Sequence, residues 1–385
     1  MPVTFSYAAC VVAVVAVVVA LEVGGGAPRE PPTGIAGPGA LTGWGVPATR
    51  LLSNLAGILM VGAVLAPTML LPGDQLPSRR RFLRYGHVAA LAVAMSAAAG
   101  LVVSASELLG EPVAAVFSEP GGAASRTLQS TTGQALGVQF LLALTVAAGT
   151  QVDRAGGRRG RGRLLEGAVL VAAVAAFVAP MMAGHAATGS DRGLASISLL
   201  LHAAAASLWV GGLVALALVA RSVPEHPAAA FDLVASVSRF SVLALGCFVT
   251  VAGSGLVNAW VRLGSLSDLW RSDYGRLVLA KSVALAMLAG IGWAHRRYTI
   301  PGLLAAGTEE AAGPRRQLVR LAGVEIVVMA ATLGVAVGLA HTPTPGGPHS
   351  HGTDHAGVSA PRHDPVAADR ARRVRSASPW ERGLR

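Results

Sequence analysis

Three histidines and a pair of methionines are the side chains of this sequence best suited to hold a metal ion. His185 follows Met181 and Met182 at the end of one apolar segment. His202 lies inside the next apolar segment, and His341 closes the last one. Imidazole and thioether groups together suit Cu(I), and imidazole alone suits Cu(II). We therefore expect these five residues to form a copper site, although each histidine alone also fits a hydrogen-bonded residue at the membrane interface.

The composition indicates a membrane protein. Of the 385 residues, 53% are hydrophobic and only 13% are charged, whereas soluble proteins carry about 25% charged residues. Apolar runs of about 20 residues recur, long enough as helices to cross a hydrocarbon core of about 30 Å. They lack the alternation of a barrel strand. The predicted fold class is therefore all-α, a polytopic membrane helical bundle in which each helix satisfies its own backbone.

Nine spans are expected, and the first has two interpretations. Its N-terminal residues contain no lysine or arginine and no clear cleavage site follows, so an uncleaved helix is favoured over a signal peptide. The expected spans are residues 7–23, 50–71, 87–109, 133–151, 164–184, 194–220, 239–261, 275–295 and 318–341.

The positive charge predicts the orientation of the spans. The net charge is +11, and it comes from arginines that cluster in every second loop. Such loops are cytoplasmic under the positive-inside rule. This places His185, His202 and His341 toward the outer face of a bacterial plasma membrane. Contact with lipid headgroups explains the arginines better than contact with nucleic acid, because they lie in short loops between spans.

Two stretches of the chain resemble each other and suggest an internal duplication. Residues 51–62 read LLSNLAGILMVG and residues 200–211 read LLHAAAASLWVG. Residues 130–139 and 272–281 also match, pairing Gln139 with Lys281. An even number of spans per unit gives two parallel four-helix repeats, and ligands often bind between repeats; chance similarity among apolar helices is the alternative. The expected domains are an N-terminal helix and outer loop (1–48), a first repeat (49–193), a second repeat (194–341) and a disordered tail (342–385).

Lys281, the one lysine of the sequence, lies inside the segment 275–295. A charge at that depth is costly. It either extends along the helix to the interface or faces the bundle and pairs with an acid such as Asp273 or Glu107. Glu166 and Glu325, near the inner ends of their spans, are interpreted as topology anchors that pair with arginines.

The tail offers a weaker metal site in His349, His351 and His355. Short histidine-rich tracts bind metals without a fold, but a disordered polar tail has the same composition. The sequence contains no Walker loop, nucleophile elbow, HExxH or CxxC motif. An enzyme is therefore not expected.

Residues 184–297 resemble the copper resistance D (CopD) family of bacterial inner-membrane proteins. The resemblance rests on GHAATGS, LLHAAAASLWVGGL, RFSVLALGCFVTVAGSGLVNAW and SDYGRLVLAKSVALAMLAGIGWAHRR. It implies copper transport or copper tolerance at the plasma membrane, beside a periplasmic copper-binding partner of the CopC type. The family pattern implies functional roles for His185, His202, Trp209, Asn258, Tyr274 and Lys281.

Two other functions remain open from the sequence. One is a b-type membrane cytochrome, in which His185 or His202 binds haem together with His341. The other is an accessory factor that loads copper into cytochrome oxidase.

Overall fold

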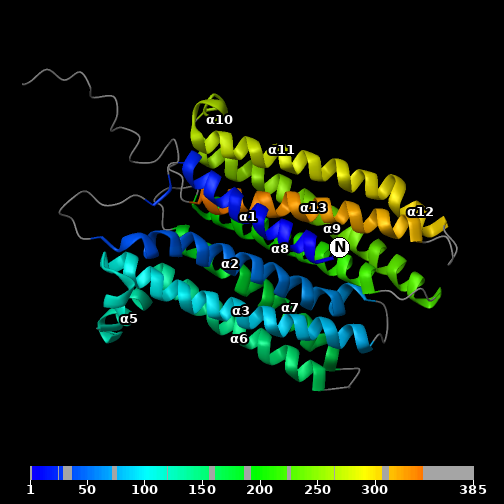
Figure 1. Cartoon of the computed structure of the whole chain (residues 1–385), viewed down its shortest axis with the longest axis horizontal. Coiled ribbons are helices and arrows are strands. Elements are labelled where there is room, and N and C mark those ends of the chain that lie inside the picture. Colours follow the sequence, from blue (N-terminus) through cyan, green and yellow to red (C-terminus); the bar gives the residue numbers. More distant parts are fainter. Residues whose placement is uncertain are drawn as a thin grey trace, which may run out of the picture. The chain divides into compact units, whose positions relative to one another are not determined.

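The computed structural model shows a bundle of long helices (Figure 1). It describes residues 2–24, 26–28, 37–71, 76–118, 120–155, 161–185, 192–222, 227–263, 265–305 and 312–340. Within these ranges there is no strand, and eight helices are long and apolar enough to cross a membrane. The predicted all-α polytopic membrane bundle is confirmed.

Each expected span corresponds to one long helix or its direct continuation, but the helices over 50–71, 87–109 and 239–261 begin about three turns earlier than expected. The first half of the chain contains α1 (Pro2–Val23), α2 (Gly39–Leu65), the π-helix η1 (Ala66–Leu70), α3 (Leu76–Leu109), α4 (Val113–Ser118), α5 (Pro120–Gln129), α6 (Thr131–Ala155), α7 (Arg161–Val178) and the 3-10 helix η2 (Ala179–His185). The second half contains α8 (Arg192–Ser222), α9 (Pro227–Arg262), α10 (Asp268–Arg271), α11 (Asp273–Ala294), the π-helix η3 (His295–Thr299), α12 (Ile300–Ala305) and α13 (Ala312–Leu339).

The first expected span corresponds to α1, which packs along α13. Ala13 and Ala20 of α1 are buried there. Gly334 and Gly338 of α13 permit this contact, because a Cβ at either position would collide with α1. Small residues let helix backbones approach closely, which matters in lipid because the hydrophobic effect does not drive helices together there. In its described apolar part, residues 8–23, α1 is shorter than the eight spans counted above.

The two halves meet where α2 crosses α8. The contact is made by Gly62 and Gly211, two positions that the sequence comparison pairs. A Cβ on Gly62 would overlap the carbonyl group of Gly211, and a Cβ on Gly211 would lie 2.6 Å from the carbonyl oxygen of Ile58. The corresponding segments therefore pack against each other backbone to backbone.

A second paired element has the same local geometry in both halves. Ser130 precedes α6, and its hydroxyl accepts a hydrogen bond from the backbone N–H of Gly133 at 3.0 Å. Ser272 precedes α11 and accepts from the N–H of Gly275 at 2.9 Å. Each glycine lies against a carbonyl of the preceding segment, where a Cβ would not fit. Serine therefore caps both helices in the same way.

The halves differ in how their middle helices pack. α3 and α6 lie against each other over much of their length, whereas α9 and α11 scarcely touch. Gln139 on α6 is 2% exposed and donates to the Ala176 carbonyl at 3.0 Å. Its counterpart Lys281 on α11 is half-buried. The first half is thus closed around a neutral amide at the level where the second half carries a charge.

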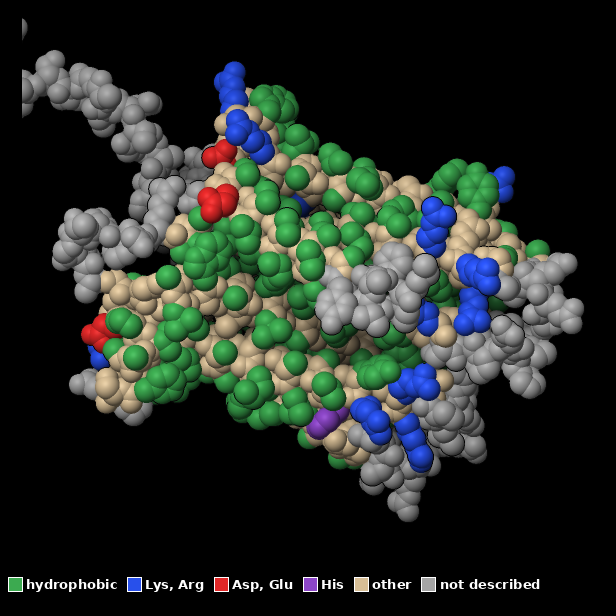
Figure 2. All heavy atoms as spheres, viewed as in Figure 1, with side chains coloured by type: hydrophobic (Ala, Val, Ile, Leu, Met, Phe, Trp, Pro, Cys, Tyr) green, Lys and Arg blue, Asp and Glu red, His purple; other side chains and the backbone are tan. Residues whose placement is uncertain are grey.

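Most of the arginine side chains visible in Figure 2 gather at the end of the bundle where α12 lies and α13 begins. Acidic side chains appear at the opposite end, near α5 and α10. Basic side chains are also visible beside the acids near α10. The arginines are thus enriched at one end, and the orientation of the spans in the membrane remains a prediction.

Candidate metal site between helices α8 and α9

A line of polar side chains follows the contact between α8 and α9. Ser198 and His202 come from α8, and Ser254 and Asn258 from α9; we call these four residues the polar seam. The amide of Asn258 donates to the Ser198 hydroxyl at 3.1 Å and to the Ser254 carbonyl at 2.9 Å. Ser198 also donates to that carbonyl at 3.0 Å. The seam is thus a connected hydrogen-bonded unit.

The seam reaches the middle of the membrane. His202 lies ten residues from the start of α8, and Ser254 eight residues from the end of α9. At 1.5 Å per residue these positions are about 15 Å and 12 Å from the outer ends of their helices. Half of a hydrocarbon core is also about 15 Å. Polar groups at this depth are costly and typically mark a substrate or ion path.

The hydrogen bonds of Ser254 favour one tautomer of His202. The Ser254 hydroxyl donates to the backbone carbonyl of Thr250, so its lone pairs can accept a hydrogen bond from the His202 Nδ1 atom, 3.0 Å away. We therefore assign the proton of the neutral ring to Nδ1. The Val251 carbonyl interacts with the same imidazole and lies 3.3 Å from the serine hydroxyl. Metal-binding histidines commonly hold one ring nitrogen in this way and present the other to the metal.

The seam leaves two lone pairs without a protein donor. The Nε2 atom of His202 has no hydrogen-bond partner among the residues that the structure describes. The side-chain oxygen of Asn258 is buried and also lacks a partner within those residues. Both atoms are acceptors and can bind a cation. Since no three His, Cys, Asp or Glu side chains gather in the described part of the chain, His202 is the strong ligand that it offers here.

Lys281 lies close enough to act electrostatically on His202. Its position eight residues into α11 is about 12 Å from the outer end of that helix. Asp273 contacts Arg276 at 3.1 Å, and Glu107 acts on Arg50. The ion pair expected between Lys281 and either acid remains a prediction. The ammonium opposes a cation at His202, so metal binding there requires Lys281 to turn away or lose its proton.

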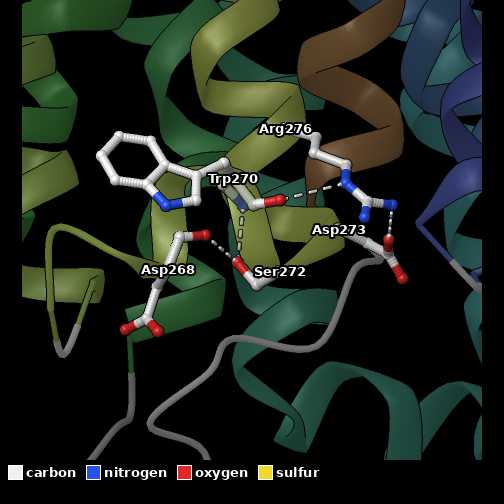
Figure 3. A network of polar contacts seen from close by, with 6 residues as sticks. Asp268, Trp270, Ser272, Asp273 and Arg276 are labelled. Atoms are coloured by element: carbon white, nitrogen blue, oxygen red, sulfur yellow. Dashed lines mark hydrogen bonds and ion pairs between the residues drawn. The ribbon is translucent and has the colours of Figure 1, made fainter.

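The start of α11 is held by a network of polar contacts in the outer loop (Figure 3). Its labelled members are Asp268, Trp270, Ser272, Asp273 and Arg276. The Ser272 hydroxyl donates to the Asp268 carbonyl at 2.6 Å, and Arg276 donates to the Trp270 carbonyl at 3.4 Å. These bonds join α10 to the first turn of α11. By holding the start of α11, they help to set the depth of Lys281 in the membrane.

Two of the family-implied residues are buried in this structure. Trp209 is 7% exposed in a hydrophobic core cluster, and its ring meets Phe248 edge to face at 5.9 Å between centroids. Tyr274 is 4% exposed in the first turn of α11. The functional roles that the resemblance implies for both residues remain predictions.

The methionine pair is divided between two environments. Residues 179–185 form a 3-10 helix instead of the expected α-helix. Met181 packs against the hydrophobic cluster around α2, α3, α6 and α7, whereas Met182 is 56% exposed. Whether either methionine joins His185 in one copper site remains a prediction.

Several candidate ligands fall outside the described side chains. The backbone of His185 ends η2, but its side chain lies outside the described residues. The same holds for His341, His349, His351 and His355. The shared site of His185 and His341, the bis-histidine haem alternative and the tail site therefore remain predictions.

The sequence reasoning missed two groups of residues. Ser198 precedes His202 by four residues, and Ser254 precedes Asn258 by four; this spacing on neighbouring helices is the signal that predicts a polar seam. Glu325, interpreted as an anchor, is instead 4% exposed, and its Oε2 atom lies 3.7 Å from the His295 Nε2 atom. Arg320, on the same helix, is exposed. His295 was missed because Arg296 and Arg297 follow it, and this pattern predicts a basic loop.

Comparison with known proteins gives a consistent family. The family model described as copper resistance protein D matches residues 234–339, and the model of the copper resistance protein D-like N-terminal domain matches residues 40–197. The copper transport protein CutJ of Bacillus subtilis (strain 168) is 31% identical over 121 residues. That match covers 31% of this chain and 22% of CutJ, so the chain spans about a fifth of that relative. No solved structure gives a significant match. The chain belongs to the copper resistance D family and is a multi-pass membrane protein, consistent with the bacterial plasma membrane.

Proposed function

We propose that this protein moves copper across the bacterial plasma membrane without enzymatic activity, and that His202 is the intramembrane ligand on the path. The observation that carries the proposal is the free Nε2 lone pair of His202 near mid-membrane, held by Ser254. Neutral imidazole binds both Cu(I) and Cu(II). Family membership and the copper transport protein CutJ, similar over part of the chain, support copper as the cargo.

The arrangement of the polar seam suits reversible binding of an ion that is transported. The buried oxygen of Asn258 offers a second, weaker ligand beside His202. The charge of Lys281 works against the bound cation. Conduction requires a site that binds the ion well enough to admit it and weakly enough to release it. One strong ligand opposed by one ammonium meets this requirement.

Residues outside the polar seam would bind copper first, at the outer face. In this proposal His185, Met182 and His341 receive copper outside, and the tail histidines His349, His351 and His355 add weak binding. A periplasmic or extracellular partner of the CopC type would deliver the ion.

We also propose that the two halves are parallel repeats with different tasks, with residues 49–193 as the scaffold and 194–341 as the conducting unit. The glycine crossing of α2 and α8 and the two serine caps support the duplication. The buried Gln139 and the tight packing of α3 on α6 support a static first half.

Copper flux into proteoliposomes tests the proposed function. The purified protein is reconstituted with a copper-sensitive dye inside, and Cu(I) is supplied outside. His202→Ala should lower the initial rate at least about tenfold, because the ligand is lost. His87→Ala is the matched control, since the His87 Nδ1 atom only joins α3 to the Ala147 carbonyl of α6 at 3.0 Å. Wild-type flux through His202→Ala, with no copper binding lost, would refute the proposal.

A further inference from the structure

A second group of buried polar atoms lies apart from the seam, between η3 and α13. Glu325 is 4% exposed and faces His295 across 3.7 Å. Neither ring nitrogen of His295 has a hydrogen-bond partner among the described residues, and the same is true of the Thr299 hydroxyl, which is 0% exposed. Buried polar groups are nearly always paired, and each exception calls for an explanation. The unpaired polar atoms of His295 and Thr299 therefore call for a functional explanation.

The cluster lies inside the membrane on the cytoplasmic side of its middle. Glu325 is ten residues from Arg315 along α13, about 15 Å by helix rise. His295 and Thr299 lie on a π-helical turn between α11 and α12. Such turns are rare and often occur at functional sites. Ionisable side chains at this depth commonly mark proton relays or ion paths.

The corresponding acid of the first half has a different partner. Glu166 of α7 forms an ion pair with Arg79 of α3 at 2.6 Å. A guanidinium does not release its proton in a protein, so the charge of Glu166 is permanently balanced. The imidazole of His295, unlike a guanidinium, can gain and lose a proton. The second half thus has an exchangeable partner where the first half has a fixed one.

Other charged side chains around the pair are directed elsewhere. Arg296 donates to the Ser241 carbonyl, Arg297 lies over the Tyr298 ring, and Arg315 donates to carbonyls at the end of α8. α12 carries no charged residue. Arg316, Arg320, Arg50 and Glu22 are exposed, Arg239 donates to the Leu71 carbonyl, and Lys281 lies beside His202. His295 is thus the titratable group that the described residues place against Glu325.

We propose that the pair of His295 and Glu325 binds one proton and exchanges it for the passage of one copper ion through the second half. The inference rests on the proposed function. With one proton the pair is neutral, with the carboxylic acid of Glu325 beside the neutral imidazole of His295. Releasing that proton leaves a carboxylate alone in a medium of low dielectric, which is costly. A Cu(I) ion in the same half supplies the missing positive charge, so copper enters as the proton leaves and the net charge is unchanged.

Proteoliposomes that carry both a copper dye and a pH dye test the exchange. In the wild type, protons should flow against copper, and the ratio of inside to outside copper should change about tenfold per unit of imposed pH difference, as one-for-one exchange requires. Glu325→Gln keeps the shape of the protonated acid and should abolish both effects. Glu166→Gln is the matched control and should retain both. Proton counterflow and gradient dependence at the wild-type level in Glu325→Gln would overturn the inference.

A second measurement covers variants that fold poorly and separates the two proposals. The infrared difference spectrum of the full chain during pH titration should show the carbonyl band of a buried carboxylic acid, absent in Glu325→Gln. His295→Gln, the alternative variant, should keep that band but lose the gradient dependence. Copper flux without proton counterflow in the wild type would refute the exchange and leave copper transport standing. The carboxyl band without any copper flux would support proton binding and refute transport.

Discussion

The hydrogen bond from His202 to Ser254 makes a sharp prediction about copper affinity. Ser254→Ala removes the hydroxyl that accepts the Nδ1 proton of His202 at 3.0 Å. The ring then loses the contact that holds its Nε2 lone pair toward a metal. Removing such a supporting partner typically costs 10–100-fold in metal affinity, which is about 1.4–2.8 kcal/mol. Because the Val251 carbonyl interacts with the same imidazole, we expect the lower end, about tenfold.

The assay is competition for Cu(I) between the purified protein and a calibrated chelator. Ser207→Ala is the control, because Ser207 is equally buried on α8 but donates only to the Ala204 carbonyl of its own helix. Its affinity should match that of the wild type. His202→Ala should abolish the binding that Ser254→Ala weakens. If His202→Ala abolishes binding while Ser254→Ala changes nothing, the argument from the tautomer is refuted.

Three further changes follow from the structure. Gly62→Ala should lower the unfolding temperature by several degrees, because its Cβ overlaps the α8 backbone and overpacking costs about 1–3 kcal/mol. The control Gly253→Ala, whose Cβ meets nothing within 4 Å, should leave the unfolding temperature unchanged. Equal unfolding temperatures for the two variants would contradict the close crossing of α2 and α8. Lys281→Met should tighten Cu(I) binding on the order of tenfold by removing a like charge and slow copper release in stopped-flow measurements; weaker binding would show that the ammonium does not oppose the ion. Reporters fused after Arg161 and after Gly189 should act as cytoplasmic and exported, and identical activity at both fusions would contradict the predicted orientation.

The fold was predictable because the bilayer allows few solutions. Apolar length predicts each long helix, and the basic loops predict which helix ends meet at the arginine-rich end. Even the resemblance between residues 130–139 and 272–281 corresponds to two serine caps of the same geometry. These features depend on local sequence and on a uniform solvent, so they need no knowledge of packing.

The site was predictable only in part, because it depends on which helix faces which. His202, Asn258 and Lys281 were named from the sequence, and the structure places all three near the α8 and α9 contact. Ser254 was missed, since a serine in an apolar helix usually bonds to its own backbone and its second role depends on the neighbouring helix.

The sequence also did not predict the contact between His295 and Glu325, because it too depends on which way the side chains face. Two arginines follow His295, and Arg320 lies five residues before Glu325. Arginines favour the interface, but packing turns both His295 and Glu325 into the bundle. A one-dimensional pattern of charges does not reveal which of two adjacent residues faces inward when a π-helical turn shifts the register.

X-ray absorption spectroscopy of the full-length protein loaded with Cu(I) tests the central claim most directly. The account predicts a nitrogen ligand at about 2.0 Å with the outer-shell scattering of imidazole. This signal should persist when His185, His341, His349, His351 and His355 are replaced by alanine, and it should disappear when His202→Ala is added to that variant. Imidazole scattering unchanged by the added His202→Ala, or a first shell made of sulfur alone, would contradict copper binding in the polar seam.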